Sequence, residues 1–320
     1  MIVRPPCGAA SHTLGVTGST AGKNRAVRGV GMRDRALVID RGPGGDPGRP
    51  LRVTVRLLGR VELAVHGRLL RLAGRQAQAL VALLVLVRRV RARDAIATDL
   101  WPDALGATGS LRQALWLLRS SLAAAGLDPD DVIESDADAL GLRPDLELDV
   151  DVDRFDQAVG GPTPDPALAV ELYQGELAEC LGHECFARER ERLADAYEDA
   201  LVLVAERRLA ERDLAGARGA ALRLLARDPL REEAHRVLLR VYGSDGTRAQ
   251  VLRQFRRLSD LLRRELDVEP LPETIAAFQQ AMRHAETRSA EAVVHLRLAE
   301  TAFVAVGPGR AAEPATAAAG

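Results

Sequence analysis

Two arginines, a glutamine and a tryptophan lie within one short stretch of the sequence, GSLRQALWLLRSSL, at residues 109–122. The leucines of this stretch recur at helical spacing and share one face of a helix: Leu111, Leu115, Leu118 and Leu122. Arg112, Trp116 and Arg119 fall together on a different face. Arginine can bind a phosphate or pair with both acceptors of guanine, and glutamine can pair in a similar way with adenine. The residue types at Arg112, Gln113, Trp116 and Arg119 therefore suit contact with a nucleic acid.

Three further residues join this set of candidate DNA-binding residues. Ser110 begins the same helix, and Arg89 and Arg91 belong to the basic run RRVRAR at residues 88–93. Arginines of such a run can hold phosphates, which position a protein on DNA without reading its sequence. The alternative is a solvated helix end for the run and a solvated helix face for the first set, with Trp116 packed under a neighbouring domain. The sequence leaves both alternatives open.

Charge is unevenly distributed along the chain, although the net charge is only −1. Residues 51–125 contain 12 arginines and 4 acidic residues, a net charge of +8. Residues 126–153 contain 11 acidic residues and one arginine, a net charge of −10. The neutral total, which by itself argues against nucleic-acid binding, thus conceals a basic block followed by an acidic one.

Hydrophobic patterns in the first half of the chain predict a small mixed fold. Alternation with a period of two over about residues 53–72, broken by glycines, predicts three short antiparallel strands. Helical periodicity follows after Gly74, over about residues 94–101 and in a third helix at 110–122. VIE and ALGL, separated by the turn SDAD, predict a two-stranded hairpin. This order predicts a winged helix-turn-helix with its third helix in the major groove of DNA.

From about residue 152 to residue 283, successive segments show i, i+3, i+4 apolar spacing, which predicts an all-helical region. Ala217 and Ala249 lie in similar helix openings 32 residues apart. A period near 34 with small residues at packing positions is typical of tetratricopeptide-like helical hairpins, which present grooves to partners. The predicted fold class is therefore mainly α with a small β component, a winged helix-turn-helix followed by a tetratricopeptide-like all-α domain.

These patterns divide the chain into four segments: a disordered extension at 1–50, the winged helix-turn-helix at 51–150, the helical domain at 151–284 and a low-complexity tail at 285–320. Whether translation starts at Met1 or Met32 stays open. GSTAGKN, in the extension, lacks the first glycine and the Ser or Thr of a phosphate-binding loop, and no strand precedes it.

The sequence predicts no metal, no cofactor and no enzymatic activity. Cys180, His183 and Cys185 lie close together, but no fourth ligand for a zinc site is near them in the sequence. The sequence shows no nucleophile and base motif. Three cysteines do not make a disulfide framework, and we find no signal-peptide pattern and no apolar run long enough to span a membrane. We therefore expect a cytoplasmic protein without a membrane partner.

The winged helix-turn-helix resembles the DNA-binding domain of the actinobacterial antibiotic regulatory proteins, the SARP family of OmpR-like winged helices. The resemblance is carried by LLGRVELAVHGRLLRLAGRQAQALVALLVL, RDAIATDLWPD, SLRQALWLLRSSL and DVDRFDQAV. Four later stretches resemble the bacterial transcriptional activator domain that follows the DNA-binding domain in this family: ELYQGELAE, ERERLADAYEDALVLVAERRLAERDLAGA, ARDPLREEAHRVLLRVY and RRELDVEPLPET. Together these stretches cover residues 51 to about 282.

This resemblance implies a transcription regulator, usually an activator, that binds repeated elements in double-stranded promoter DNA and contacts RNA polymerase. The second domain is implied to mediate self-association, as in a homodimer, or regulation. Larger relatives add an ATPase module, whose motif is missing here, which indicates the short form.

Two departures from the family pattern lower the expected affinity for DNA. The hairpin tip contains Asp136, Ala137 and Asp138, where the family often has a basic or neutral tip, and carboxylates repel phosphates. Ser120 stands where the family often has a second arginine.

We predict a sequence-specific DNA-binding transcriptional regulator. The alternative is a protein-interaction module with a degenerate winged helix, acting through its tetratricopeptide-like domain. The basic block favours the first and the acidic hairpin favours the second. If ~4 to 6 phosphates are neutralised, the logarithm of the binding constant falls against the logarithm of the salt concentration with a slope of roughly −4 to −5, which a protein-only interaction need not show.

Overall fold

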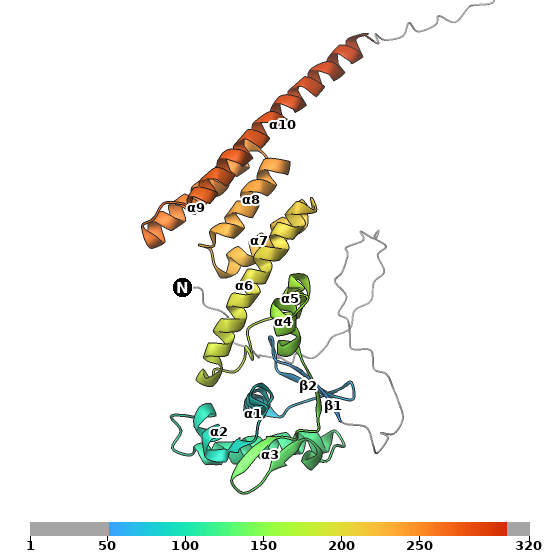
Figure 1. Cartoon of the computed structure of the whole chain (residues 1–320), viewed down its shortest axis with the longest axis vertical. Helices are drawn as coiled ribbons and strands as arrows, with labels where there is room; N and C mark the ends of the chain where they lie inside the picture. Colours follow the sequence, from blue (N-terminus) through green and yellow to red (C-terminus); the bar gives the residue numbers. More distant parts are fainter. Residues whose placement is uncertain (1–50, 306–320) are drawn as a thin grey trace, which may run out of the picture. The chain divides into compact units, whose positions relative to one another are not determined.

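The computed structural model describes residues 51–305, apart from the side chains of residues 292–294 and 296–305. The predicted extension, with GSTAGKN and Met32, and the part of the predicted tail from residue 306 onward lie outside the described residues. Helices dominate the described chain and two small sheets accompany them, which confirms the mainly α fold class (Figure 1). No described helix combines the length and the apolar character needed to cross a membrane.

The chain forms two compact units, which divide between Asp195 and Ala196. The first unit contains β1 (Arg52–Arg56), β2 (Glu62–Val65), β3 (Arg68–Leu70), α1 (Gly74–Val87), β4 (Arg91–Ala92), α2 (Arg93–Leu100), α3 (Ala107–Ala124), the 3-10 helix η1 (Pro129–Asp131), β5 (Ile133–Ser135), β6 (Ala139–Leu142), β7 (Glu147–Val150), α4 (Asp151–Gly160), α5 (Pro166–Leu172) and the 3-10 helix η2 (Glu184–Phe186). The unit boundary falls inside α6 (Ala187–Ala210). The predicted order of three strands, three helices and a hairpin is confirmed in β1 to β3, α1 to α3 and β5 to β6.

The first unit contains two sheets. One has the strand order β3-β2-β1-β7, with β1 antiparallel to β2 and parallel to β7. The other has the order β4-β6-β5 and contains the predicted hairpin. The alternating Val53 and Val55 of β1 are buried, as a half-buried strand requires, and Val55 lies opposite both Leu63 of β2 and Val150 of β7. The first sheet thus supplies one side of the apolar core.

Helix α3 supplies another part of this core. Its predicted leucine face is buried: Leu111, Leu115, Leu118 and Leu122 are at most 8% exposed. This face packs against α1 and α2. Helix α1 ends at Arg88, which adopts the left-handed conformation (φ 52°) and donates its backbone N–H to the carbonyl of Leu84. Burial of this leucine face leaves the opposite face of α3 available for contact.

The end of β1 is held by residues that follow β7. The carboxylate of Asp151 accepts hydrogen bonds from the backbone N–H groups of Leu57 and Leu58 at 2.8–2.9 Å. Beyond it, Leu58 forms an isolated β-bridge with Leu177, and the N–H of Gly59 donates to Glu176 at 3.0 Å. Burial raises the pKa of Asp151 in spite of these bonds. The residues on either side of the predicted boundary at 150 and 151 therefore fold as one unit, and the proposed domain limits remain a prediction.

The second unit is a stack of helices: the last part of α6, then α7 (Leu214–Arg227), α8 (Glu232–Asp245), α9 (Arg248–Leu266) and α10 (Pro272–Ala305). Helices α7 and α9 begin 34 residues apart, and the residues before them, Asp213 and Thr247, both cap the helix with a side-chain oxygen. A period of 34 residues also relates two buried pairs: Ala217 with Val251, and Leu224 with Leu258. The repeat is tetratricopeptide-like, as expected.

Ala217 and Ala249, which lie in similar helix openings, do not occupy equivalent positions of the repeat. Ala249 is exposed on the first turn of α9, whereas Val251 occupies the buried position equivalent to Ala217. The predicted start of the tail at residue 285 lies within α10, which continues to Ala305. Tight packing of α8 on α10 explains Gly243, since a Cβ there would lie 2.8 Å from the Cα of Ala281.

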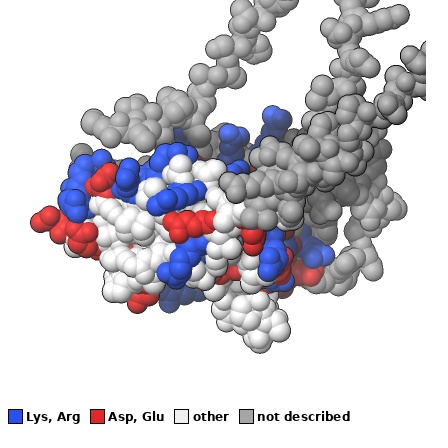
Figure 2. Space-filling model, turned by 90° about the horizontal axis from the view of Figure 1, so that it is seen from above, with Lys and Arg blue, Asp and Glu red and all other residues white. Residues whose placement is uncertain are grey.

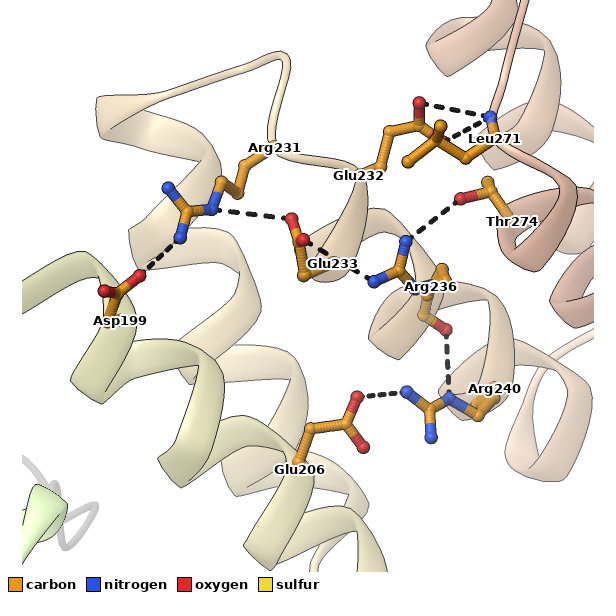
Figure 3. Close-up of polar contacts among 9 residues, drawn as sticks. All are labelled: Asp199, Glu206, Arg231, Glu232, Glu233, Arg236, Arg240, Leu271 and Thr274. Carbon is orange, nitrogen blue, oxygen red and sulfur yellow. Dashed lines mark hydrogen bonds and ion pairs between the residues drawn. The ribbon is translucent and has the colours of Figure 1, made fainter. Parts of the chain in front are cut away.

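Polar side chains connect α6, α8 and α10 within the second unit (Figure 3). Arg231 contacts Asp199 of α6 at 2.5 Å and Glu233 at 3.4 Å, and Arg236 donates to Thr274 of α10 at 3.3 Å. Further along the same helices, Arg240 pairs with Glu206, while Glu232 accepts from the N–H of Leu271. These contacts join α8 and the residue before it to α6 and to the start of α10.

Candidate nucleic-acid interface

Helix α3 presents a polar and aromatic face on the side away from its leucines. Arg112, Gln113 and Trp116 are exposed, and Trp116 is 65% exposed in spite of its size. Within the described chain, Arg112 has no ion pair with a carboxylate at salt-bridge distance. A large exposed aromatic beside a free guanidinium is unusual on a monomer surface and is typical of a contact site. The structure thus leaves Arg112, Gln113 and Trp116 exposed on α3, and their contact with DNA stays a prediction.

The preceding elements place this face at one end of the first unit. Helix α2 packs on α3, and in the loop between them the Ala104 N–H donates to the Trp101 carbonyl and the Ala107 N–H donates to the Ala104 carbonyl, both at 3.2 Å. Ser110 is half-buried in the first turn of α3. In Figure 1, α3 lies across the β1 and β2 strands from α4. This arrangement is a helix-turn-helix whose second helix is free on one face.

Arg119, two turns after Arg112, is held by a carboxylate. Its Nη2 donates to Oδ1 of Asp130 in η1 at 2.9 Å. The Arg119 side chain is 36% exposed and the Asp130 side chain is 72% exposed. Arg112 and Arg119 both lie on α3, but of these two only Arg112 has no carboxylate partner among the described contacts.

The arginines of the basic run at residues 88–93 differ in their hydrogen-bond and ion-pair partners. Arg88 pairs with Asp153 of α4, and Arg91 of β4 contacts Asp99 of α2 at 2.5 Å. Arg93 donates from Nε to the carbonyl of Asp136 at 3.0 Å, and its other nitrogen contacts the Ser135 hydroxyl at 2.6 Å. Arg89 is exposed and pairs with no carboxylate among the described residues.

The hairpin β5–β6 is acidic at its tip and closely packed at its base. Oδ1 of Asp136 accepts from the N–H groups of Asp138 and Ala139 at 2.8 and 2.7 Å. These backbone hydrogen bonds lower the pKa of Asp136, so the tip stays charged well below neutral pH. Gly141 of β6 lies so close to Val90 that a Cβ would approach it to 2.9 Å. The hairpin is therefore firmly attached, with a negative tip.

Basic and acidic side chains alternate on the face of the described surface drawn in Figure 2, where no continuous field of one sign appears. Apart from this view, four arginines of the basic block are matched by carboxylates: Arg56, Arg88, Arg91 and Arg119. Two acidic partners, Asp130 and Asp153, come from the acidic block. The block of +8 therefore overstates the charge that is free to meet a ligand.

Cys180, His183 and Cys185 lie between α5 and α6 and are not part of α3. Burial, followed by the negative charge of Asp99, raises the pKa of Cys185 to about 11, so the group stays a thiol at neutral pH. Burial lowers the pKa of His183, which packs edge-on against Trp101 and Phe186. Among the described residues, no three His, Cys, Asp or Glu side chains are grouped so that they would hold a metal ion.

Residues 165–283 match the family model described as the bacterial transcriptional activator domain. Residues 165–283 are therefore similar to a bacterial transcriptional activator domain. The matched residues begin at Asp165, which caps α5, and end within α10, so they include the 34-residue helical repeat of the second unit. No curated protein matches the chain significantly.

A solved structure of Mycobacterium tuberculosis EmbR in complex with a low-affinity phosphopeptide shares the fold. The match has a TM-score of 0.55 and 23% sequence identity, and it covers 77% of this chain and 71% of the EmbR chain. The family match agrees with the activator-type domain that the sequence resemblance implied for the second half of the chain, and the similarity to EmbR shows a shared fold.

The partners of the arginines were not found by sequence reasoning. Asp130 lies only eleven residues after Arg119, directly beyond the turn at Gly126 that ends α3. The abrupt change from basic to acidic composition at this turn was the available signal. Asp153, 65 residues from Arg88, could not be paired with it before the first unit was assembled.

Proposed function

We propose that the protein is a transcriptional regulator that binds double-stranded promoter DNA with α3 in the major groove. The observation that supports this most directly is the free face of Arg112, Gln113 and Trp116 on a helix whose leucine face is buried. The activator domain at residues 165–283 favours an activator that contacts RNA polymerase and associates with a second copy of itself.

Each residue has a role that suits its environment. Arg112 pairs with guanine or a phosphate, Gln113 pairs with adenine, and the Trp116 ring contacts a thymine methyl group. Ser110, in the first turn of α3, donates to a phosphate. Arg89 adds a second free phosphate contact.

Arg91 and Arg119 have carboxylate partners and contribute more weakly. Arg91 is 21% exposed in its side chain and stays close to Asp99, so its effect on a phosphate is mainly through its charge. Arg119 must exchange Asp130 for a DNA group before it can bind one.

The test is a selection of genomic DNA fragments with the full chain, followed by affinity measurements on the selected duplex. Arg112→Ala is expected to lower affinity by about 5- to 100-fold, which corresponds to the roughly 1–3 kcal/mol of a bidentate contact. Arg154→Ala is the matched control, because Arg154 is also exposed and lies on α4, across the sheet from α3. Recurrent fragments whose binding depends on Arg112 and not on Arg154 would establish the function.

The alternative is a protein-interaction module, and the charged tip formed by Asp136 and Asp138 is the observation that favours it. In that case the selection returns no recurrent fragment, and Arg112→Ala and Arg154→Ala retain the same background of DNA as the unmodified chain. That result would exclude α3 as a DNA reader.

A further inference from the structure

The two arginines on the exposed side of α3 are chemically alike but differently placed. Arg112 and Arg119 are seven residues apart, so they project from the same side of the helix, with Trp116 between them. Arg112 is exposed and, among the described contacts, free of a carboxylate, whereas Arg119 donates to Asp130 at 2.9 Å. A helix that docks in the major groove would bring DNA to both of them.

We propose that Asp130 is an internal competitor of DNA for Arg119 and thereby limits the affinity of α3 for DNA. This inference rests on the proposed function. In the free protein the Asp130 carboxylate occupies the place that a phosphate or a guanine edge would take on the Arg119 guanidinium. Binding DNA therefore requires Arg119 to exchange one acceptor for another, and breaking its hydrogen bond to Asp130 offsets part of the free energy of its bond to DNA.

The geometry is suited to exchange rather than to a permanent structural bond. The pair is a single hydrogen bond between one nitrogen and one oxygen, without the bidentate geometry that makes such pairs strong. The Asp130 side chain is 72% exposed, and exposed pairs of this kind contribute only about 0–1 kcal/mol. No other hydrogen bond of the Asp130 side chain is found in the described chain, so its loss should not disturb η1, which is capped by Asp128.

Competition makes the two arginines unequal in their contribution to binding. Because Arg112 gives up no partner, the whole free energy of its DNA contact appears as affinity. Arg119 contributes only the difference between its interaction with DNA and its interaction with Asp130. Replacement of Asp130 by a neutral residue of the same shape removes the ion pair, so the whole free energy of the Arg119 contact with DNA appears as affinity. It also removes a negative charge beside the DNA.

The test is a set of affinity measurements on full-length variants with a fixed duplex, either a selected fragment or a random-sequence control. Asp130→Asn is expected to strengthen binding to both duplexes by about two- to fivefold, the range that follows from the energy of an exposed pair. Arg119→Ala is expected to weaken binding less than Arg112→Ala does. In the Arg119→Ala background, Asp130→Asn should lose most of its effect on DNA affinity, because Asp130 then has no arginine for which it competes with DNA.

Asp131→Asn is the matched control for charge. Asp131 lies beside Asp130 in η1, is exposed and makes no ion pair with Arg119, so its replacement changes the net charge equally but frees no arginine. If Asp131→Asn strengthens binding as much as Asp130→Asn, or if Asp130→Asn keeps its effect without Arg119, general repulsion is responsible and the competitor is excluded.

The outcomes separate this inference from the proposed function. If Arg112→Ala weakens DNA binding while Asp130→Asn leaves it unchanged, the proposed function stands and the competitor is excluded. If neither the unmodified chain nor Asp130→Asn binds either duplex, both are excluded.

Discussion

At the scale of single residues, the environment of each side chain on α3 separates packing from contact. Leu118 is 1% exposed in the core, whereas Trp116, two positions earlier, is 65% exposed and extends from the opposite side of the helix. Trp101, the other tryptophan, is half-buried at the end of α2 and meets the His183 ring edge-on at 6.2 Å. Trp116 is thus the tryptophan whose apolar surface has no counterpart in the fold.

Stability and DNA binding should respond in opposite ways to truncation of these two residues. Leu118→Ala is expected to lower the free energy of unfolding by about 2–5 kcal/mol, because it leaves a cavity in the core. Trp116→Ala is expected to change it by no more than about 0.5 kcal/mol, as for other exposed positions, while weakening DNA binding. Urea unfolding followed by circular dichroism, combined with binding to the selected duplex, checks both. A strongly destabilised Trp116→Ala variant would mean that this ring packs against the protein.

Sequence periodicity predicted this separation at the residue scale but did not predict the partners of the arginines. Burial follows from helical spacing, which is local, and the leucine face of α3 is accordingly buried throughout. Ion pairs depend on which elements the fold brings together. Arg88 meets Asp153 and Arg119 meets Asp130 only because α4 and η1 pack near the ends of α1 and α3.

At the scale of elements, a buried histidine connects two helices of the helical repeat, α8 and α9. His235 of α8 is 2% exposed, and its Nε2 contacts the carbonyl of Pro229 at 3.0 Å. Its Nδ1 lies 2.7 Å from the amide nitrogen of Gln254 in α9, so Nδ1 accepts and Nε2 donates in the neutral ring. Burial lowers the pKa of His235, and the positive charge of Arg257 lowers it further, against the opposing effects of Pro229 and two nearby carboxylates.

This arrangement predicts a loss of stability in mild acid. Since the pKa of His235 is lower in the folded than in the unfolded chain, the unfolded chain takes up the proton first as the pH falls below about 6.5. Its contribution to stability is therefore fully present above that pH and declines below it, by at most about 1.4 kcal/mol per pH unit. Urea midpoints between pH 7.5 and pH 5.5 measure the decline, which His235→Asn should reduce.

The pKa of His183 is also lowered by burial, so the part of the decline that remains in His235→Asn is assigned to His183. A His183→Asn, His235→Asn double variant is the control, and its midpoint should vary least with pH. An unchanged decline in the double variant would contradict a neutral, buried His235.

The sequence predicted most helices and the strands β1 to β3, β5 and β6, but it missed β4 and β7. Long apolar periodicity identified α1 to α3 and the helices of the repeat, since each of these buries a continuous stripe. Strand β4 has two residues and β7 has four, and their pairing with β6 and β1 comes from distant parts of the chain. Ala217 and Ala249 look alike by residue type, whereas burial makes Val251 the equivalent of Ala217 in the repeat.

At the scale of the whole molecule, charge is balanced by short-range pairing more than the block composition suggests. The chain has a net charge of −1, and the acidic block begins directly after α3. Carboxylates from this block and from α2 already hold Arg88, Arg91 and Arg119. The electrostatic attraction available for DNA is therefore smaller than the 12 arginines of residues 51–125 would provide if all were free.

The salt dependence of DNA binding measures how many of these arginines meet phosphates. With Arg89 and Arg112 free and Arg119 in competition, about two to three phosphates are neutralised, so the logarithm of the binding constant should fall against that of salt with a slope of roughly −2 to −3. This is shallower than the roughly −4 to −5 expected from composition, which assumed ~4 to 6 neutralised phosphates. Asp130→Asn should steepen the slope by about one, since it adds one phosphate contact. A slope near −5 for the unmodified chain would show that the paired arginines exchange their carboxylates for phosphates, and a slope near zero would favour a protein partner over DNA.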